Sequence, residues 1–295
     1  MAEMVTDTAP EPRNGRWRPF GRRNGPREEP AVALPLQIGA WIAFVVLLLP
    51  VVIVVLAGLN SGDHLTWPPE GLSLRWIFAF FEASEFLDAY VFSLWLAVVV
   101  MVISTTLGTM AAIFLTRMTF PGRNLLRAYF LSPLILPGIV LGLALYVFYV
   151  SSGIGLSRTL PGLIIGHVLV TAPYVIGTVS AALFNFDIAL EEAARSLGAG
   201  PFTAFRKVTL PIIGPGVAAG AIFAFIVSFG QFDVSLFLST PNYTPLPIAL
   251  YISLRYTFEP TAAAAGIFAI ALVVISMLLT SRLINIRRFA GIKFS

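Results

Sequence analysis

Long apolar runs dominate this chain, and short polar segments separate them. An α-helix needs about 20 predominantly apolar residues to cross the hydrocarbon core of a membrane. Six runs reach that length, at residues 36–59, 89–116, 128–150, 162–185, 212–238 and 262–286. The pattern therefore predicts an all-α integral membrane protein in which residues 36–286 form a domain of six transmembrane helices.

Prolines interrupt two of the predicted spans. Pro133 and Pro137 fall in the third span, and Pro173 falls in the fourth. Membrane helices tolerate proline because neighbouring helices satisfy the carbonyl groups that it frees. The Pro137-Gly138 pair predicts a bend in the third span.

The composition agrees with a membrane protein and excludes several kinds of site. The chain is 57% hydrophobic and 12% charged, which is about half the charge of an average soluble domain. It has no cysteine, so a disulfide framework or a thiolate metal site is excluded. Its two histidines, His64 and His167, are far apart in the sequence. We therefore expect no metal ion or cofactor to be bound by this chain.

Basic residues mark one set of alternating loops. Of the 19 Lys and Arg residues, 16 lie in the N-terminal 35 residues, in the loops at 117–127 and 186–211, and at the C-terminal end from Arg282 onward. Because cytoplasmic loops carry the excess of basic residues, both termini and the segment 186–211 are expected to be cytoplasmic. This rule accounts for the arginines without a nucleic-acid partner.

The two ends of the chain are predicted to be tails. Residues 1–35 are rich in Arg, Pro and Glu, which predicts a disordered, basic cytoplasmic tail. Residues 287–295 form the predicted cytoplasmic C-terminal tail.

The cytoplasmic segment is predicted to hold two short helices. Asp187 is a good N-cap for a first helix over residues 188–197. Gly198 suits the position that ends this helix. Pro201 begins a second helix, and Pro211 precedes the fifth span.

One face of the first helix has an unusual composition. Ala189, Ala193 and Leu197 share a narrow stripe at i, i+4 and i+8. Such a stripe of mostly small residues lets another helix or a protein groove approach closely. The alternative is that the segment is a solvated connector, whose charges only keep the loop inside the cell.

The spacing within the segment resembles a known signature. Glu192-Ala193-Ala194 is followed after three residues by Gly198, after nine more by Val208, and after one more by Leu210-Pro211. This pattern resembles the cytoplasmic signature of binding-protein-dependent ABC importer permeases, with Val208 where the family has Ile. Residues 36–286 are most similar to the second permease of spermidine/putrescine-type systems, as in "TPLPIALYISLRYTFEPTAAAA".

The resemblance implies a fold and a mechanism. The fold would be that of a type I ABC importer permease in the bacterial cytoplasmic (inner) membrane. By alternating access it would translocate a small polar solute, with polyamines or related organic cations as one candidate class. The partners implied are a cytoplasmic ABC ATPase dimer that holds ATP and Mg, a second homologous permease and an extracytoplasmic solute-binding protein.

The same resemblance implies roles for residues in the segment. In the family, helices with this signature dock into a cleft of the ATPase. Glu192 would then supply a charged contact, Ala193 a close approach and Gly198 the turn. The implied ATPase-coupling residues are Glu192, Ala193, Leu197, Gly198 and Pro211.

ATP hydrolysis is not expected on this chain. A phosphate-binding Walker A loop needs Gly-Lys-Ser/Thr, but the only lysines, Lys207 and Lys293, follow Arg206 and Ile292. The chain is therefore predicted not to be an enzyme by itself.

A polar stripe in the fifth span is the candidate translocation path. Ser228, Gln231 and Ser235 would share one helical face, and Asp233 is the only acidic residue inside a predicted span. Charged residues in spans are costly and usually functional, and by resemblance an acid here suits a cationic substrate. Relatives often carry a second acid where this chain has Gln231 or Phe232. Because Asp233 is near the outer end of the span, an interfacial, hydrated position is the alternative.

Other functions are weighed against the permease. An ion-coupled secondary transporter would use Asp233 and His167, although we expect His167 to be packed and bonded to a neighbouring helix. An intramembrane enzyme would need a paired catalytic group, which the spans lack. The apolar segment 240–260 is either a surface helix or a re-entrant element.

Overall fold

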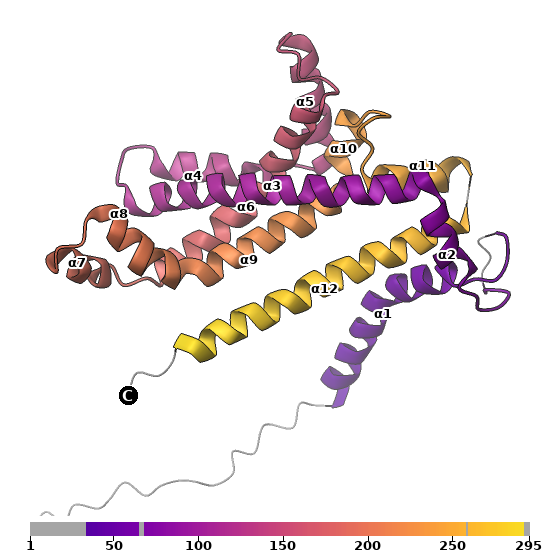
Figure 1. The fold of residues 1–295 in the computed structure, drawn as a ribbon, viewed down its shortest axis with the longest axis horizontal. Helices are drawn as coiled ribbons and strands as arrows, with labels where there is room; N and C mark the ends of the chain where they lie inside the picture. Colours follow the sequence, from indigo (N-terminus) through magenta and orange to yellow (C-terminus); the bar gives the residue numbers. More distant parts are fainter. Residues whose placement is uncertain (1–33, 65–67, 258, 292–295) are drawn as a thin grey trace, which may run out of the picture. The chain divides into compact units, whose positions relative to one another are not determined.

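The fold was analysed in a computed structural model that describes residues 34–64, 68–257 and 259–291, without the side chains of residues 280 and 283–291 (Figure 1). The chain divides into two compact units, residues 1–48 and 49–295. Because the description begins at residue 34 and ends at residue 291, most of the predicted N-terminal tail and part of the predicted C-terminal tail lie outside the described residues. Within the described ranges the regular structure is helical, apart from two isolated β-bridges.

The helices follow one another along the chain, and apart from the segment 59–74 between α1 and α2 the connections are short. Their bounds are α1 Leu34–Gly58, α2 Arg75–Glu82, α3 Ser84–Arg117, α4 Arg123–Leu131, α5 Gly138–Ser151, α6 Leu160–Phe184, α7 Ala189–Ser196, α8 Pro201–Ala204, α9 Leu210–Phe229, α10 Asp233–Leu238, α11 Leu246–Tyr256 and α12 Pro260–Gly291. A 3-10 turn at Ser132–Leu134 follows α4, and a π turn at Phe205–Thr209 joins α8 to α9.

Five helices in the described ranges are long and apolar enough to cross a membrane. They are α1, α3, α6, the continuous helix Pro201–Phe229 and residues Pro260–Leu279 of α12. A sixth span exists if Arg123–Leu134 and Gly138–Ser151 count as one broken span. The protein is thus an all-helical, multi-pass membrane protein.

The predicted bend in the third span is confirmed, and it is sharp. The two helical parts meet at an angle of 104° (Figure 1). Pro137, at the N-cap of α5, has φ −56° and ψ 127°. Proline lacks an N–H group, and it also disfavours the helical conformation of the preceding residue. Together these effects end one helix and start another.

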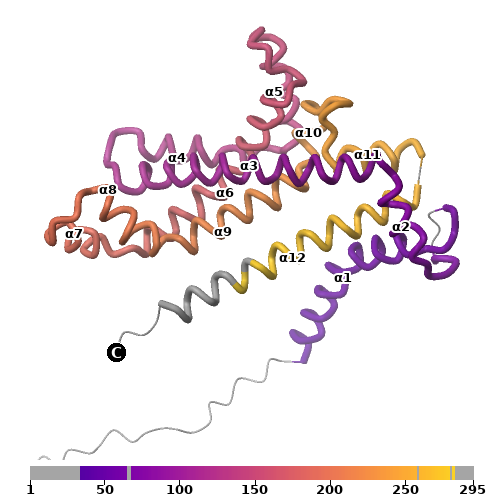
Figure 2. The backbone as a smooth tube through the Cα atoms, viewed as in Figure 1, coloured from indigo at the N-terminus to yellow at the C-terminus, as the bar shows by residue number. Residues whose placement is uncertain are grey.

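Helices α3, α6 and α9 form the packed centre of the second unit and run side by side (Figure 2). Glycines allow their close approach: a Cβ on Gly108 of α3 would lie 2.7 Å from the Cβ of Val175 on α6. Leu115, Val179 and Ile213 are fully buried where these helices meet. Small residues at helix contacts are typical of membrane proteins, where van der Waals packing drives association.

The fifth predicted span differs from the structure at both ends. It was expected as one helix over 212–238, but α9 ends at Phe229 and a short helix, α10, begins at Asp233. At the other end, the helix continues unbroken from Pro201 through the π turn. The ring of Pro211 would clash with the carbonyl group four residues earlier in a regular α-helix, and the π turn lies at that place.

Candidate functional site

Helix α7 begins at Ala189 with Ile188 at its N-cap position, one residue later than predicted, and Asp187 lies just before it. The carboxylate of Asp187 accepts a hydrogen bond from the backbone N–H of Ala189 at 3.0 Å. This bond satisfies one of the donors that a helix N-terminus leaves free. Glu191 and Glu192 follow in the first turn, where negative charge is favourable for the helix dipole.

The end of α7 confirms the predicted glycine turn. Gly198 has φ +91°, in the left-handed region. Its N–H donates to the carbonyl of Arg195 at 3.0 Å, and the N–H of Ala199 donates to the carbonyl of Ala194 at 3.1 Å. This pair of bonds is a Schellman motif, which ends helices where a glycine follows.

The face of α7 that carries the predicted coupling residues is exposed. None of the α7 residues is buried, and Ala189, Glu192 and Ala193 are all exposed. Leu197 exposes 90% of its surface, and Phe202 on α8 exposes 73%. The end of α7 and the start of α8 thus each present a large apolar side chain on an otherwise charged segment.

The fifth predicted coupling residue has a different position. Pro211 is exposed and lies in the first turn of α9, directly after the π turn. It therefore belongs to the membrane helix rather than to the exposed face of α7.

One residue of the segment was missed by the sequence analysis. The carboxylate of Glu191 accepts two hydrogen bonds from the guanidinium of Arg117, at 3.2 and 2.7 Å, and one from the Thr209 hydroxyl at 2.6 Å. The bond from Arg117 is the main cause that holds the pKa of Glu191 below its ordinary value. The available signal was an acidic residue before the Glu-Ala-Ala motif and an arginine at the end of the second span.

The candidate path residues Ser228 and Ser235 meet at one histidine. The two ring nitrogens of His167 each lie 2.9 Å from a serine oxygen, Nδ1 from Ser228 and Nε2 from Ser235. The three side chains are buried, with exposed fractions of at most 3%. His167 is therefore packed and bonded to neighbouring helices, as expected.

The break after Phe229 changes the predicted polar stripe. Ser228 lies in the last turn of α9 and Ser235 lies in α10, so the stripe is not one face of a continuous helix. Gln231 lies between the two helices, half-buried, and its carbonyl accepts a bond from Ser235 at 2.7 Å. That these residues line a path remains a prediction.

Asp233 is half-buried and begins α10. Its carboxylate lies against Gly138, the first residue of α5, so closely that a Cβ on that glycine would overlap it. A helix N-terminus favours a nearby negative charge. This contact gives a local physical reason for an acid at this position, independent of any substrate.

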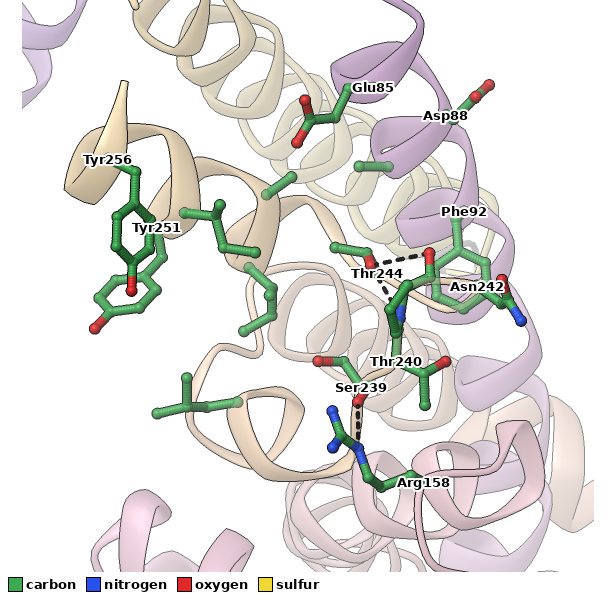
Figure 3. Close-up of a pocket in the computed structure, with 16 residues that line it drawn as sticks. Glu85, Asp88, Phe92, Arg158, Ser239, Thr240, Asn242, Thr244, Tyr251 and Tyr256 are labelled. Atoms are coloured by element: carbon green, nitrogen blue, oxygen red, sulfur yellow. Dashed lines mark hydrogen bonds between the residues drawn. The ribbon is translucent and has the colours of Figure 1, made fainter. Parts of the chain in front are cut away.

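A cavity of about 800 Å³ lies where the start of α3 meets the segment from α10 to α11 (Figure 3). Glu85 and Asp88 lie on one side and Arg158 on the other, where it donates to the carbonyl of Ser239 at 3.4 Å. Next to the cavity, α11 packs on α3, and the N–H of Leu246 donates to the Ser93 hydroxyl at 2.7 Å. The segment 240–260 thus contains a helix that lies on α3.

Comparison with known proteins identifies relatives over most of this architecture. Residues 104–288 match the family described as "Binding-protein-dependent transport system inner membrane component". The chain is 30% identical over 239 residues to the spermidine/putrescine transport system permease protein PotC of Escherichia coli K12, covering 81% of this chain and 89% of the relative. It is 33% identical over 216 residues to the molybdenum transport system permease protein ModB of the same organism, covering 68% and 94%.

Two solved structures share the fold. A bacterial ABC transporter that imports the acidic polysaccharide alginate has a chain with a TM-score of 0.67 at 18% identity, covering 85% of this chain and 94% of that one. A chain of the inward-facing MetNI methionine ABC transporter has a TM-score of 0.54 at 21% identity, covering 68% and 95%. The match to the family of transport components and the identity to the PotC permease do not favour the ion-coupled transporter. This chain belongs to the family of binding-protein-dependent transport system inner membrane components, and it is a permease subunit of an ABC importer.

Proposed function

We propose that the exposed face of α7, with the turn at Gly198, is the surface through which a cytoplasmic ATPase dimer drives this permease. The observation that carries the proposal is that a charged segment leaves Ala193 and Leu197 uncovered beside Glu192. ATP and Mg²⁺ would be bound by the ATPase. Closure of the ATPase would move α7, and the spans would then alternate between inward and outward access.

The proposed topology has six spans and two cytoplasmic termini. The bent pair of helices around Pro137 would form the third span, and 16 of the 19 basic residues would then face the cytoplasm. In this arrangement α7 and the loop at 117–127 lie on the same side of the membrane. The cavity beside Glu85 would lie on the outer side.

The complete transporter is proposed to contain further subunits. A second, homologous permease would supply the other half of the path, and an extracytoplasmic binding protein would deliver the solute. The family description names dependence on a binding protein. One structure of the alginate transporter is a complex with a periplasmic protein bound to an alginate pentasaccharide.

The transported solute is proposed to be a small organic cation. The support is the likeness to polyamine permeases over most of the chain. The molybdenum permease is as similar in identity, so family likeness alone does not determine the solute. Uptake of labelled putrescine and molybdate by the assembled transporter separates the two.

The coupling surface is tested by reversing one charge. Glu192→Lys changes an exposed residue of α7, while Glu82→Lys makes the same change on an exposed residue of α2. We expect Glu192→Lys to lower uptake and ATPase co-purification at normal membrane abundance, and Glu82→Lys to leave both unchanged. If Glu192→Lys transports and binds the ATPase normally, the segment is a solvated connector.

A further inference from the structure

The two consecutive glutamates of α7 point in different directions. The side chain of Glu192 is exposed and, within the described residues, no hydrogen bond to it is found. The side chain of Glu191 exposes only 13% of its surface and faces the rest of the protein. The two residues are therefore equipped for different tasks, although they are chemically identical.

Glu191 joins three elements through charged hydrogen bonds. Arg117, the last residue of α3, donates one bond to each oxygen of its carboxylate, at 3.2 and 2.7 Å. Thr209, at the end of the π turn, donates to the Oε2 atom at 2.6 Å, and Arg117 reaches the same hydroxyl at 3.3 Å. A bidentate guanidinium–carboxylate pair fixes orientation as well as distance. We call these residues the Arg117–Glu191–Thr209 cluster.

The cluster is well shielded from water. Thr209 is fully buried, and the side chain of Arg117 exposes 24% of its surface. The guanidinium of Arg117 also lies over the ring of Phe186, with its central carbon 5.8 Å from the ring centre. Because shielded charges interact more strongly than exposed ones, this contact differs from an ordinary surface ion pair.

Helix α7 has little else to hold it. It contains no fully buried residue, and beyond its own linkers it contacts α8 and the π turn. It is joined to α6 and α8 only by the short linkers 185–188 and 197–200. The Arg117–Glu191–Thr209 cluster is thus the polar attachment that ties α7 both to the end of α3 and to the beginning of α9.

We infer that Arg117, Glu191 and Thr209 are positioning residues that pass a displacement of α7 to the spans α3 and α9, while Glu192 contacts the ATPase. The inference rests on the proposed coupling function of α7. It divides that function between two neighbouring residues, one for binding the motor and one for transmitting its motion. The π turn directly after α8 places Thr209 at the start of the span, so the same cluster reaches two membrane helices.

The experiment measures uptake and ATP hydrolysis together. The complete transporter, with its ATPase, partner permease and binding protein, is reconstituted in vesicles. Glu191→Gln removes the charge of the carboxylate and one of its acceptor oxygens, and Thr209→Val removes the hydroxyl with its two bonds. Thr203→Val is a matched control on an exposed threonine of α8. We expect the two cluster variants to keep ATPase co-purification but to lose about fivefold or more in solute moved per ATP. Thr203→Val should retain the wild-type ratio.

Further variants separate transmission from simple stabilisation. Thr209→Ser keeps the hydroxyl and should retain the wild-type ratio, and the exchange Arg117→Glu with Glu191→Arg should recover part of what Glu191→Gln loses. An unchanged ratio in Glu191→Gln and Thr209→Val would overturn the inference, and so would a loss of ATPase binding that parallels the loss of uptake. If no ATPase co-purifies with the wild-type chain, the proposed function itself fails instead.

Discussion

Gly198 offers a test of the turn that ends α7, because a side chain can be added there without a steric clash inside the protein. Its φ of +91° is in the left-handed region, yet a Cβ built there would meet no atom within 4 Å. Any effect of Gly198→Ala must therefore come from the backbone conformation. A non-glycine residue pays about 1–2 kcal/mol for the left-handed conformation. That energy would lower the population of the turn relative to other conformations by a factor of about 5 to 30.

Gly200 is the matched control for this change. It lies two residues away with equally open space around it, but its φ is −65°, which any residue can adopt. We expect Gly198→Ala to lower uptake per permease in the membrane, Gly198→Val to lower it further, and Gly200→Ala to leave it unchanged. Gly198→Asn should retain most activity because asparagine tolerates the left-handed region. Normal uptake by both Gly198→Ala and Gly198→Val would refute the role of the turn.

Three other predictions concern the spans. His167→Ala should lower the free energy of unfolding by about 2–4 kcal/mol, because two buried serine hydroxyls lose a partner; unchanged thermal stability in detergent would contradict this. Gly142→Ala should destabilise the protein by about 1–3 kcal/mol, since a Cβ there would lie 2.8 Å from a backbone oxygen of α10. Gly177→Ala, with open space around it, should not destabilise it. Reporter fusions that are active only outside the cytoplasm should be silent at residue 200 and active at 245; the reverse result would rule out the proposed topology.

Features that depend on neighbouring residues in the chain could be predicted from the sequence. The bend at Pro137-Gly138 and the left-handed turn at Gly198 follow from what proline and glycine permit in the backbone. The hydrogen bond that Asp187 makes at the start of α7 is of the same kind. Long apolar runs likewise predicted the five candidate spans of the described ranges, because a membrane crossing requires a minimum length.

Features that depend on distant residues could not be predicted. In the run 212–238, Gly230 is the C-cap of α9 and α10 begins at Asp233; glycine and aspartate are local stop and start signals, which the apolar composition on either side outweighed in the prediction of one helix. The meeting of Ser228 and Ser235 at His167 joins positions more than 60 residues apart. Such contacts become visible only when the helices are placed in three dimensions.

The pair formed by Arg117 and Glu191 shows the same limit. The residues are 74 positions apart in the sequence, and Arg117 was used only as a marker of the cytoplasmic side. The family motif directed attention to Glu192, whose side chain is exposed. Glu191, the residue beside it, is bonded to Arg117 and Thr209 but belongs to no motif of its own.

The central claim is that the exposed face of α7 meets an ATPase, and a single introduced cysteine tests it most directly. The chain has no cysteine, so Leu197→Cys places the only thiol on the most exposed apolar residue of this face. Leu143→Cys, on the apolar helix α5, is the control, because it is also exposed but lies on a helix remote in sequence from α7. In membranes that contain the assembled transporter, a thiol crosslinker should join Leu197→Cys, but not Leu143→Cys, to the co-expressed ATPase. Absence of that crosslink in a transporter that still imports its solute would contradict the account.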